Sequence, residues 1–182
     1  MKKIIKLDIG CGSSKKNGFI GVDQLKLEGV DIVHDLNVIP YPFQDNYADE
    51  IILDNVLEHL NNPIDVIHEL HRIAKPLCQI TIKVPYFRSF YAVIDPTHKH
   101  LFSYSYFFYF DKKHIYNQQY RYFNIFFNIK SIKFDTCYKK ENMRFFHRFI
   151  RKIANTYPTK YESKLGHIFP LNEIEYILEV DK

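Results

Sequence analysis

The residues with the clearest capacity for chemistry lie near the start of the chain. Gly10 and Gly12 flank Cys11 directly after an apolar run, and Asp23 ends a second apolar run. Glycine lets a backbone approach a ligand closely, because no Cβ intervenes. A carboxylate at the tip of the neighbouring strand can accept hydrogen bonds from both hydroxyls of a ribose. The spacing therefore predicts a nucleoside site at one edge of a parallel sheet.

The elements that must position these residues are two strands, expected at 4–9 and 19–22. A dinucleotide site would need a third glycine where Lys15 stands, and an acid about 20 residues after the first glycine. Residues 11–18 leave room for about one helical turn, so no full helix can direct its N-terminus at a pyrophosphate. A ligand without phosphates fits better. The alternative is an ordinary glycine turn in an α/β protein.

The run Asp-Ile-Gly-Cys-Gly at residues 8–12 resembles motif I of the class I S-adenosylmethionine (SAM)-dependent methyltransferases, in particular the small Rossmann-like members of the methyltransferase type 11 kind. The resemblance implies SAM as cofactor. It implies backbone contacts from Gly10, Cys11 and Gly12 near the methionine moiety and ribose binding by Asp23. Asp8 is expected to orient the amino group through the turn or a water.

A third short strand, expected at 30–33, is followed by Asp35 and Leu36. In the family, an acid at this place faces the adenine amino group and the next residue lies near the ring, so both residues look like adenine contacts. A carboxylate can accept a hydrogen bond from an exocyclic amine. The alternative is that Asp35 only caps a turn.

Residues 54–60 follow an expected fourth strand and resemble the Leu-Glu-His segment of many small-molecule and lipid methyltransferases. The resemblance places Asn55 beside the cofactor. His59 is a candidate base or a structural hydrogen-bonding residue. No Asn/Asp-Pro-Pro-Tyr run stands here, which argues against methylation of nucleobase amino groups.

Residues 85–127 form an aromatic insertion after an expected fifth strand at 79–84, and they hold 17 of the 30 aromatic residues. The insertion follows the carboxyl end of that strand, on the cofactor side of the sheet, so we expect it to cover the acceptor. Its Asp-Pro-Thr-His run at 95–98 resembles that of a subset of the family. His98 is a candidate general base, because an imidazole can accept a proton near neutral pH. The alternative is a structural role in the loop.

Composition excludes several classes of protein. The chain has 182 residues, which suits one domain over 1–182, and it has no run of 18 apolar residues for a membrane span. Its three cysteines are far apart, and His68 and His71 lack an evident third ligand, so no metal site is expected. No signal peptide is visible, and a cytoplasmic location is the expectation.

Charge is unevenly distributed along the chain. Residues 112–160 carry 12 Lys or Arg against two acids, whereas residues 1–111 carry 11 against 14 acids. This asymmetry suggests an anionic partner or surface. A helix expected at 141–155 is basic and contains Phe145 and Phe149. It could lie on an anionic membrane, or cover the sheet with its apolar face.

These observations lead to one expectation for the whole chain. The resemblance implies an α/β, Rossmann-like sheet of seven mostly parallel strands, with an antiparallel last strand at 173–180 inserted between the fifth and sixth. Helices should cover both faces, with the first helix shortened. The expected function is SAM-dependent methyl transfer to an oxygen or nitrogen of a small-molecule, sugar or lipid acceptor. The alternatives are a non-catalytic SAM-binding or interaction module and an RNA-modifying enzyme.

Overall fold

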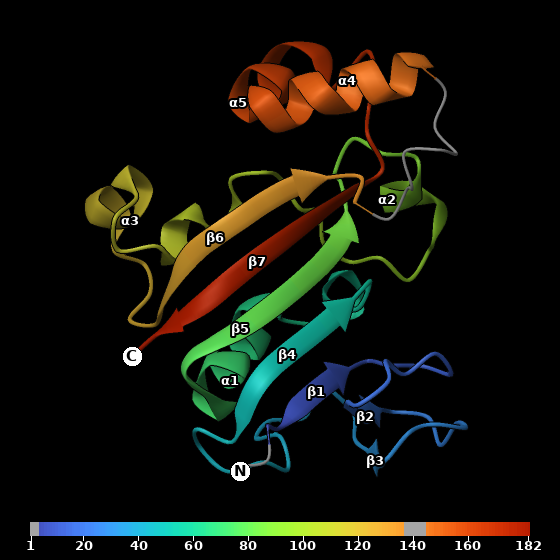
Figure 1. Cartoon of the computed structure of the whole chain (residues 1–182), viewed down its shortest axis with the longest axis vertical. Helices are drawn as coiled ribbons and strands as arrows, with labels where there is room; N and C mark the ends of the chain where they lie inside the picture. The colour runs from blue at the N-terminus through green and yellow to red at the C-terminus, as the bar shows by residue number, and fades with distance from the viewer. Residues whose placement is uncertain (1–3, 137–144) are drawn as a thin grey trace.

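The computed structural model describes residues 4–136 and 145–182, and a seven-stranded sheet runs through it (Figure 1). The strand order is β3-β2-β1-β4-β5-β7-β6, and β7 runs in the opposite direction to the other six strands. The predicted strand number and the inserted last strand are confirmed. The strands are β1 (Lys6–Ile9), β2 (Ile20–Asp23), β3 (Ile32–Val33), β4 (Ala48–Asp54), β5 (Ala74–Pro85), β6 (Phe126–Phe134) and β7 (Glu173–Asp181).

Helical segments follow β4, β5 and β6. They are η1 (Leu57–His59), α1 (Pro63–Ile73), α2 (Tyr91–Ile94), η2 (Tyr106–Phe110), α3 (Ile115–Tyr120), α4 (Phe145–Thr156), α5 (Pro158–Lys160) and the π-helical turn η4 (Tyr161–Leu165). The expected start of the basic helix at 141 lies outside the described residues. Within those residues, no helix combines the length and apolar character that crossing a bilayer requires.

Helix α1 shows how local sequence determines an element. The Asn62 side chain accepts a hydrogen bond from the backbone N–H of Ile64 at 3.1 Å, and Pro63 occupies the first helical position. Val66 and Leu70 are among the buried residues on its apolar face. The helix lies behind β4 and β5 in Figure 1, where it covers one side of the sheet.

Among the described residues, no helix covers the opposite side of the sheet in the same way. The connections at 10–19 and 24–31 form turns, and no helix lies in front of β1, β4 or β5 in Figure 1 among the described residues. The expectation of helices on both faces is therefore corrected, and the shortened first helix is absent. Connections of this length are shorter than the dozen or more residues that a helical crossover between parallel strands usually takes.

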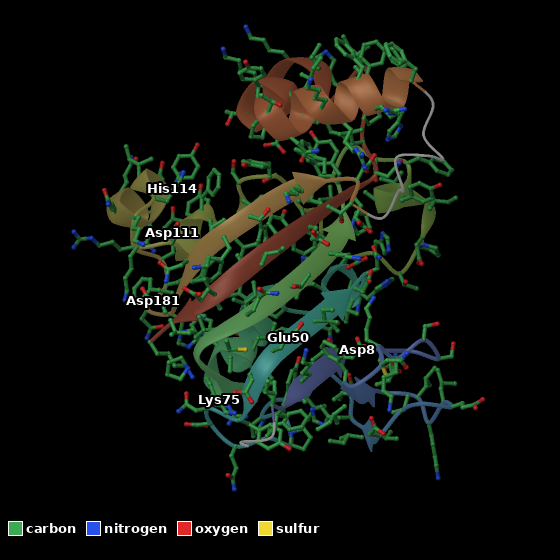
Figure 2. The ribbon with its side chains drawn as sticks, viewed as in Figure 1. Asp8, Glu50, Lys75, Asp111, His114 and Asp181 are labelled. Atoms are coloured by element: carbon green, nitrogen blue, oxygen red, sulfur yellow. The ribbon has the colours of Figure 1, made fainter. Side chains whose placement is uncertain are left out.

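Charged side chains make this uncovered face compatible with water. Lys6 pairs with Glu50 across β1 and β4 at 2.7 Å, and Asp54 pairs with Lys83 across β4 and β5 at 3.3 Å. Figure 2 marks Glu50 on this face. Opposite charges on neighbouring strands stabilise a sheet by about 0.2–1 kcal/mol per pair. The sheet therefore needs no second helical layer to hide apolar side chains here.

Much of the aromatic insertion belongs to the core. Phe102, Phe107 and Phe110 are buried, and the ring of Phe107 lies 4.8 Å from that of Tyr176 on β7. Phe110 stacks on Phe123 at 4.1 Å. These rings fill the space beside β7 and β6, whereas members of the stretch 91–99 line the cavities next to the turns after β1 and β4.

Candidate active site

The turns after β1 and β4 meet at the carboxyl edge of the sheet. Gly10 has φ +72°, and a Cβ added there would lie 2.4 Å from Cγ2 of Val56. Asn55 also adopts positive φ, at +56°, and its backbone N–H donates to the Lys83 carbonyl at 3.0 Å. Asn tolerates this conformation better than most residues. The two turns therefore depend on a glycine at position 10 and on close packing against Val56.

Asp23 stands at the tip of β2 with its carboxylate held in place. One oxygen accepts the backbone N–H of Gly12 at 2.9 Å, and the other accepts that of Leu25 at 3.0 Å. A carboxylate offers about four acceptor positions, so each oxygen can still accept one more hydrogen bond. The arrangement suits two neighbouring hydroxyl groups.

A cavity of about 550 Å³ opens beside this carboxylate. It is lined by six residues that the sequence singled out, namely Gly10, Asp23, Asp35, Leu36, Asn55 and His59. Sequence reasoning missed further lining residues, Gln24, Asn37, Val56, Leu60, Thr97 and Lys99. Thr97 and Lys99 flank His98, so the Asp-Pro-Thr-His run had already marked their segment.

The other expected cofactor residues lie behind the cavity wall. Asp8 is 3% exposed and its carboxylate accepts the backbone N–H of Lys16 at 2.8 Å, while burial raises its pKa. The backbone N–H groups of Gly10 and Cys11 both donate to the Val22 carbonyl. That of Gly12 is bonded to Asp23, so all three amides are engaged within the chain. Asp8 stabilises the turn through its bond to Lys16. Gly10 and Gly12 can let a ligand approach the backbone closely, but their N–H groups are already bonded within the chain.

Asp35 combines both roles considered for it. One of its carboxylate oxygens accepts the backbone N–H of Asn37 at 2.9 Å and its side-chain amide at 3.0 Å. These hydrogen bonds lower the pKa of Asp35. The residue therefore caps a turn and still lines the cavity with an ionised carboxylate, next to the buried Leu36.

A second cavity of about 480 Å³ adjoins the first and shares Asn55 and His59 with it. Its lining includes His98 and Tyr91 from the insertion. The backbone N–H of Lys99 donates to the Glu58 carbonyl at 2.8 Å, which ties the insertion to η1. The rings of His59 and His98 therefore lie 4.6 Å apart, although the residues are distant in sequence.

Glu58 lines the second cavity and is a further residue that sequence reasoning missed. Its side chain is buried, and neither carboxylate oxygen has a hydrogen-bond partner in another described residue. Burial raises the pKa of Glu58 to about 8, and the charges of Asp54 and Asp95 add to the effect. One oxygen lies 3.9 Å from Nε2 of His98. No pattern within residues 56–60 distinguishes Glu58 from an exposed acid, because its contact with His98 depends on the insertion that bonds to η1.

The hydrogen bonds of the two histidines define their tautomers. Thr97 donates its hydroxyl proton to Asp95 at 2.6 Å, so the 2.9 Å bond between Thr97 and His59 must be donated by Nδ1 of the imidazole. His98 directs Nδ1 at the carbonyl of Ala92, at 3.2 Å, and must also donate. In the neutral rings Nε2 therefore carries the lone pair. Burial and the neighbouring His98 lower the pKa of His59, which favours this neutral form.

Comparison with known proteins agrees with this architecture. Residues 20–82 match a family model described as a methyltransferase domain. No curated protein matches the chain.

Solved structures share the fold at low sequence identity. A SAM-dependent methyltransferase from Archaeoglobus fulgidus is 22% identical over 97% of this chain and 86% of its own, with a TM-score of 0.56. A chain from the complex between the Haloferax volcanii Trm112 methyltransferase activator and the putative methyltransferase is 14% identical over 100% and 84%, with a TM-score of 0.59. The [4+2]-cyclase SpnF is 17% identical over 97% and 74%, with a TM-score of 0.57.

The SpnF likeness shows that this fold is not reserved for proteins described as methyltransferases. The sheet order agrees with the fold of these structures, and the domain match extends from β2 into β5. Residues 20–82 therefore resemble a methyltransferase domain, and the chain as a whole has the fold of solved SAM-dependent methyltransferases.

Proposed function

We propose that this protein transfers the methyl group of SAM to an oxygen or nitrogen of a small-molecule, sugar or lipid acceptor. The observation that carries the proposal is the pair of adjoining cavities that share Asn55 and His59. The first is lined by the residues expected to hold a nucleoside, and the second by titratable side chains. A methyl donor in one cavity and an acceptor in the other would meet at Asn55.

The residues of the first cavity fit SAM. Asp23 has acceptor capacity left for both ribose hydroxyls, Asp35 and Leu36 take the adenine, and Gly10 forms part of the cavity wall. Asn55 faces both cavities. The cofactor supplies a methyl group that its sulfonium already activates.

The chain's own contribution to catalysis is then mainly alignment. Fixing two reactants in line can lower a barrier by about 7–11 kcal/mol in favourable cases. An acceptor hydroxyl or amine must also lose a proton, and Nε2 of His98 or of His59 can accept it. Both imidazoles are oriented by their Nδ1–H bonds, so the accepting nitrogen is held in a defined direction.

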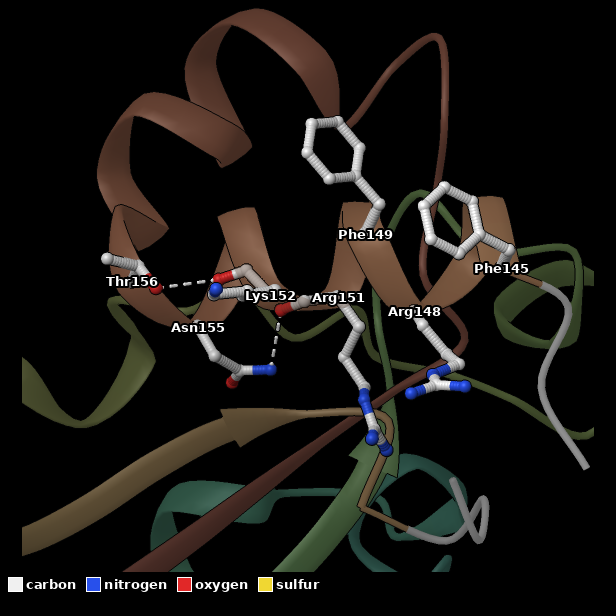
Figure 3. Close-up of a pocket in the computed structure, with 7 residues that line it drawn as sticks. All are labelled: Phe145, Arg148, Phe149, Arg151, Lys152, Asn155 and Thr156. Atoms are coloured by element: carbon white, nitrogen blue, oxygen red, sulfur yellow. Dashed lines mark hydrogen bonds between the residues drawn. The ribbon is translucent and has the colours of Figure 1, made fainter. Parts of the chain in front are cut away.

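The surface of α4 favours an anionic or lipid-linked acceptor. The helix packs through Ile150 and Ala154, not through Phe145 and Phe149 as the sequence reading of a sheet-covering helix supposed. Both rings are exposed, and with Arg148 they line a hollow of about 580 Å³ (Figure 3). Figure 1 places α4 beyond the carboxyl ends of β5 and β6. Exposed phenyl rings beside basic residues suit the interface of an anionic membrane.

The cofactor site is tested by calorimetric titration of SAM and its demethylated product into the purified protein. We expect binding by the wild type and loss of binding in Asp23→Ala, because the ribose loses its carboxylate partner. Glu28→Ala removes the same charge from an exposed position in the following loop and should bind normally. A folded wild type without affinity for SAM, or an Asp23→Ala variant with unchanged affinity, would refute the assignment.

Methyl transfer is tested separately, with isotope-labelled SAM and fractionated lipid, sugar and small-molecule extracts. Label in a lipid or sugar fraction, absent with Asp23→Ala, supports the proposal. Tight SAM binding with no labelled product in any fraction favours a non-catalytic module. Label recovered in RNA, with affinity that falls steeply as salt rises, favours the RNA-modifying alternative.

A further inference from the structure

Glu58, His59 and His98 form a cluster at the junction of the two cavities. One ligand atom from each lies within 4.8 Å of the others. We infer that these three side chains bind a divalent transition-metal ion. The inference departs from the sequence expectation of no metal, which had considered only the cysteines and the histidine pair on α1.

Hydrogen bonds fix the tautomer and the orientation of the two imidazoles in a way that suits metal ligands. Because Nδ1–H of His98 donates to the Ala92 carbonyl and that of His59 donates to Thr97, each ring presents the lone pair of Nε2. Metal-binding histidines typically donate their second ring N–H to a carbonyl or carboxylate group in this way. Here the Thr97 hydroxyl accepts the bond from His59 and donates its own proton to the Asp95 carboxylate at 2.6 Å.

Glu58 supplies an observation independent of the histidines. Its side chain is 1% exposed, and both oxygens lack a hydrogen-bond partner in another described residue. A buried carboxylate without a partner is costly unless a counter-charge accompanies it. A cation between this carboxylate and the two Nε2 atoms supplies the charge and also gives the oxygens a bonding partner.

The distances are close to those of a coordination site. Ligands about 2.1 Å from one ion in a tetrahedral arrangement lie about 3.4 Å apart. Nε2 of His98 lies 3.9 Å from the nearer oxygen of Glu58, and the bond from Lys99 to the Glu58 carbonyl holds the two segments together. Side-chain rotations that bring the ligand atoms closer by about 0.5 Å for Glu58 and His98, and by at most about 1.4 Å for the other pairs, complete the site. Two imidazoles and one carboxylate suit Zn²⁺, Fe²⁺ or Mn²⁺ better than Ca²⁺ or Mg²⁺.

Three protein ligands leave coordination positions open toward the second cavity. An oxygen of the acceptor can take one of these positions, which would orient it beside Asn55 and lower the pKa of a hydroxyl group. With the ion bound, the Nε2 lone pairs of both histidines are occupied, so the hydroxyl proton passes to water and not to an imidazole. This part of the inference rests on the proposed function, and it narrows the acceptor to compounds with a metal-binding oxygen.

The test is titration of the chelator-treated protein with Zn²⁺ alone, by calorimetry, and with Co²⁺, by visible absorption. We expect one ion per chain. Glu58→Gln keeps the shape of the side chain and should weaken binding at least about 100-fold, as should His98→Ala. Thr97→Val should cost about 10-fold, because His59 loses its orienting partner. His100→Ala removes a neighbouring histidine outside the cluster and should bind like wild type.

Absence of a bound ion in the folded wild type would overturn the inference, as would equal affinity in Glu58→Gln. SAM titrations on the same samples separate it from the proposed function. Normal SAM binding without metal binding would remove the metal site alone. Metal binding without SAM binding would support the metal site but contradict the proposed methyl transfer, and with it the idea that the ion orients an acceptor.

Discussion

The packing of Gly10 against Val56 allows a quantitative test of how the glycine turn is built. In Gly10→Ala the new Cβ would lie 2.4 Å and 2.7 Å from the two methyl carbons of Val56, and the residue would keep a φ of +72°. Left-handed backbone costs a non-glycine residue about 1–2 kcal/mol. Overpacking of a closed site costs about 1–3 kcal/mol. We therefore expect Gly10→Ala to lower the free energy of unfolding by about 2–5 kcal/mol.

A second substitution separates these two costs. Val56→Ala removes both obstructing methyl groups, and by itself it destabilises the protein through lost burial of a side chain that is 8% exposed. In the double variant the steric cost largely disappears and the backbone cost remains. The double variant should therefore be less destabilised than the sum of the single variants, by about 1–3 kcal/mol.

Urea unfolding of the four proteins at 25 °C measures this coupling, and SAM titration shows whether the restored turn still binds the cofactor. Gly12→Ala is the matched control, because Gly12 has φ +53° but no atom within 4 Å of an added Cβ. It should pay only the backbone cost and show no coupling to Val56→Ala. Additive effects of Gly10→Ala and Val56→Ala, within about 0.5 kcal/mol, would refute the steric reasoning.

Two further predictions concern other parts of the molecule. Arg72→Met should cost about 3–5 kcal/mol at pH 7, because it leaves the buried Glu69 carboxylate without its charged partner. In the wild type, burial opposes ionisation of Glu69, but bonds from Arg72 and the Tyr41 N–H lower its pKa, so this stabilisation is lost as pH falls through the lowered pKa. The deficit of the variant should therefore shrink at pH 4, and an equal deficit in urea unfolding at pH 4 and pH 7 would contradict the argument. Replacing both Phe145 and Phe149 with Ser should weaken cosedimentation with anionic vesicles about 10-fold or more, whereas Ile115→Ser, an exposed apolar residue on α3, should not. Unchanged sedimentation of the double variant would show that α4 is not the membrane contact.

Local sequence patterns were sufficient to predict the parts of this protein that depend on neighbouring residues. Apolar runs mark the strands, and Asn62-Pro63, an N-cap residue followed by proline at the first helical position, marks the start of α1. The glycines at 10 and 12 marked the turn, and Asp23 marked the strand end beside it. Each of these signals acts within a few residues, through side-chain periodicity, capping or allowed φ values, so it can be recognised without knowledge of the partners in space.

Some local predictions failed where tertiary contacts decided the outcome. The sequence alone predicts a long loop at 156–170, but this stretch contains α5 and η4. Tyr161 is buried there, and its hydroxyl donates to the Phe169 carbonyl and accepts the Leu171 N–H. A tyrosine with such contacts can hold a compact turn together that propensity alone does not predict.

Only the tertiary structure decided which side chains meet beside the expected cofactor residues, above all Glu58 and His98. Glu58 reads in sequence as part of a Leu-Glu-His run, and nothing local shows that it is buried or that His98 reaches it. That contact arises because the insertion after β5 folds back and bonds to η1 through Lys99. The charge-paired open face of the sheet arises likewise from the register of β1, β4 and β5. Burial and the meeting of distant side chains depend on the sum of long-range packing, which no window of the sequence contains.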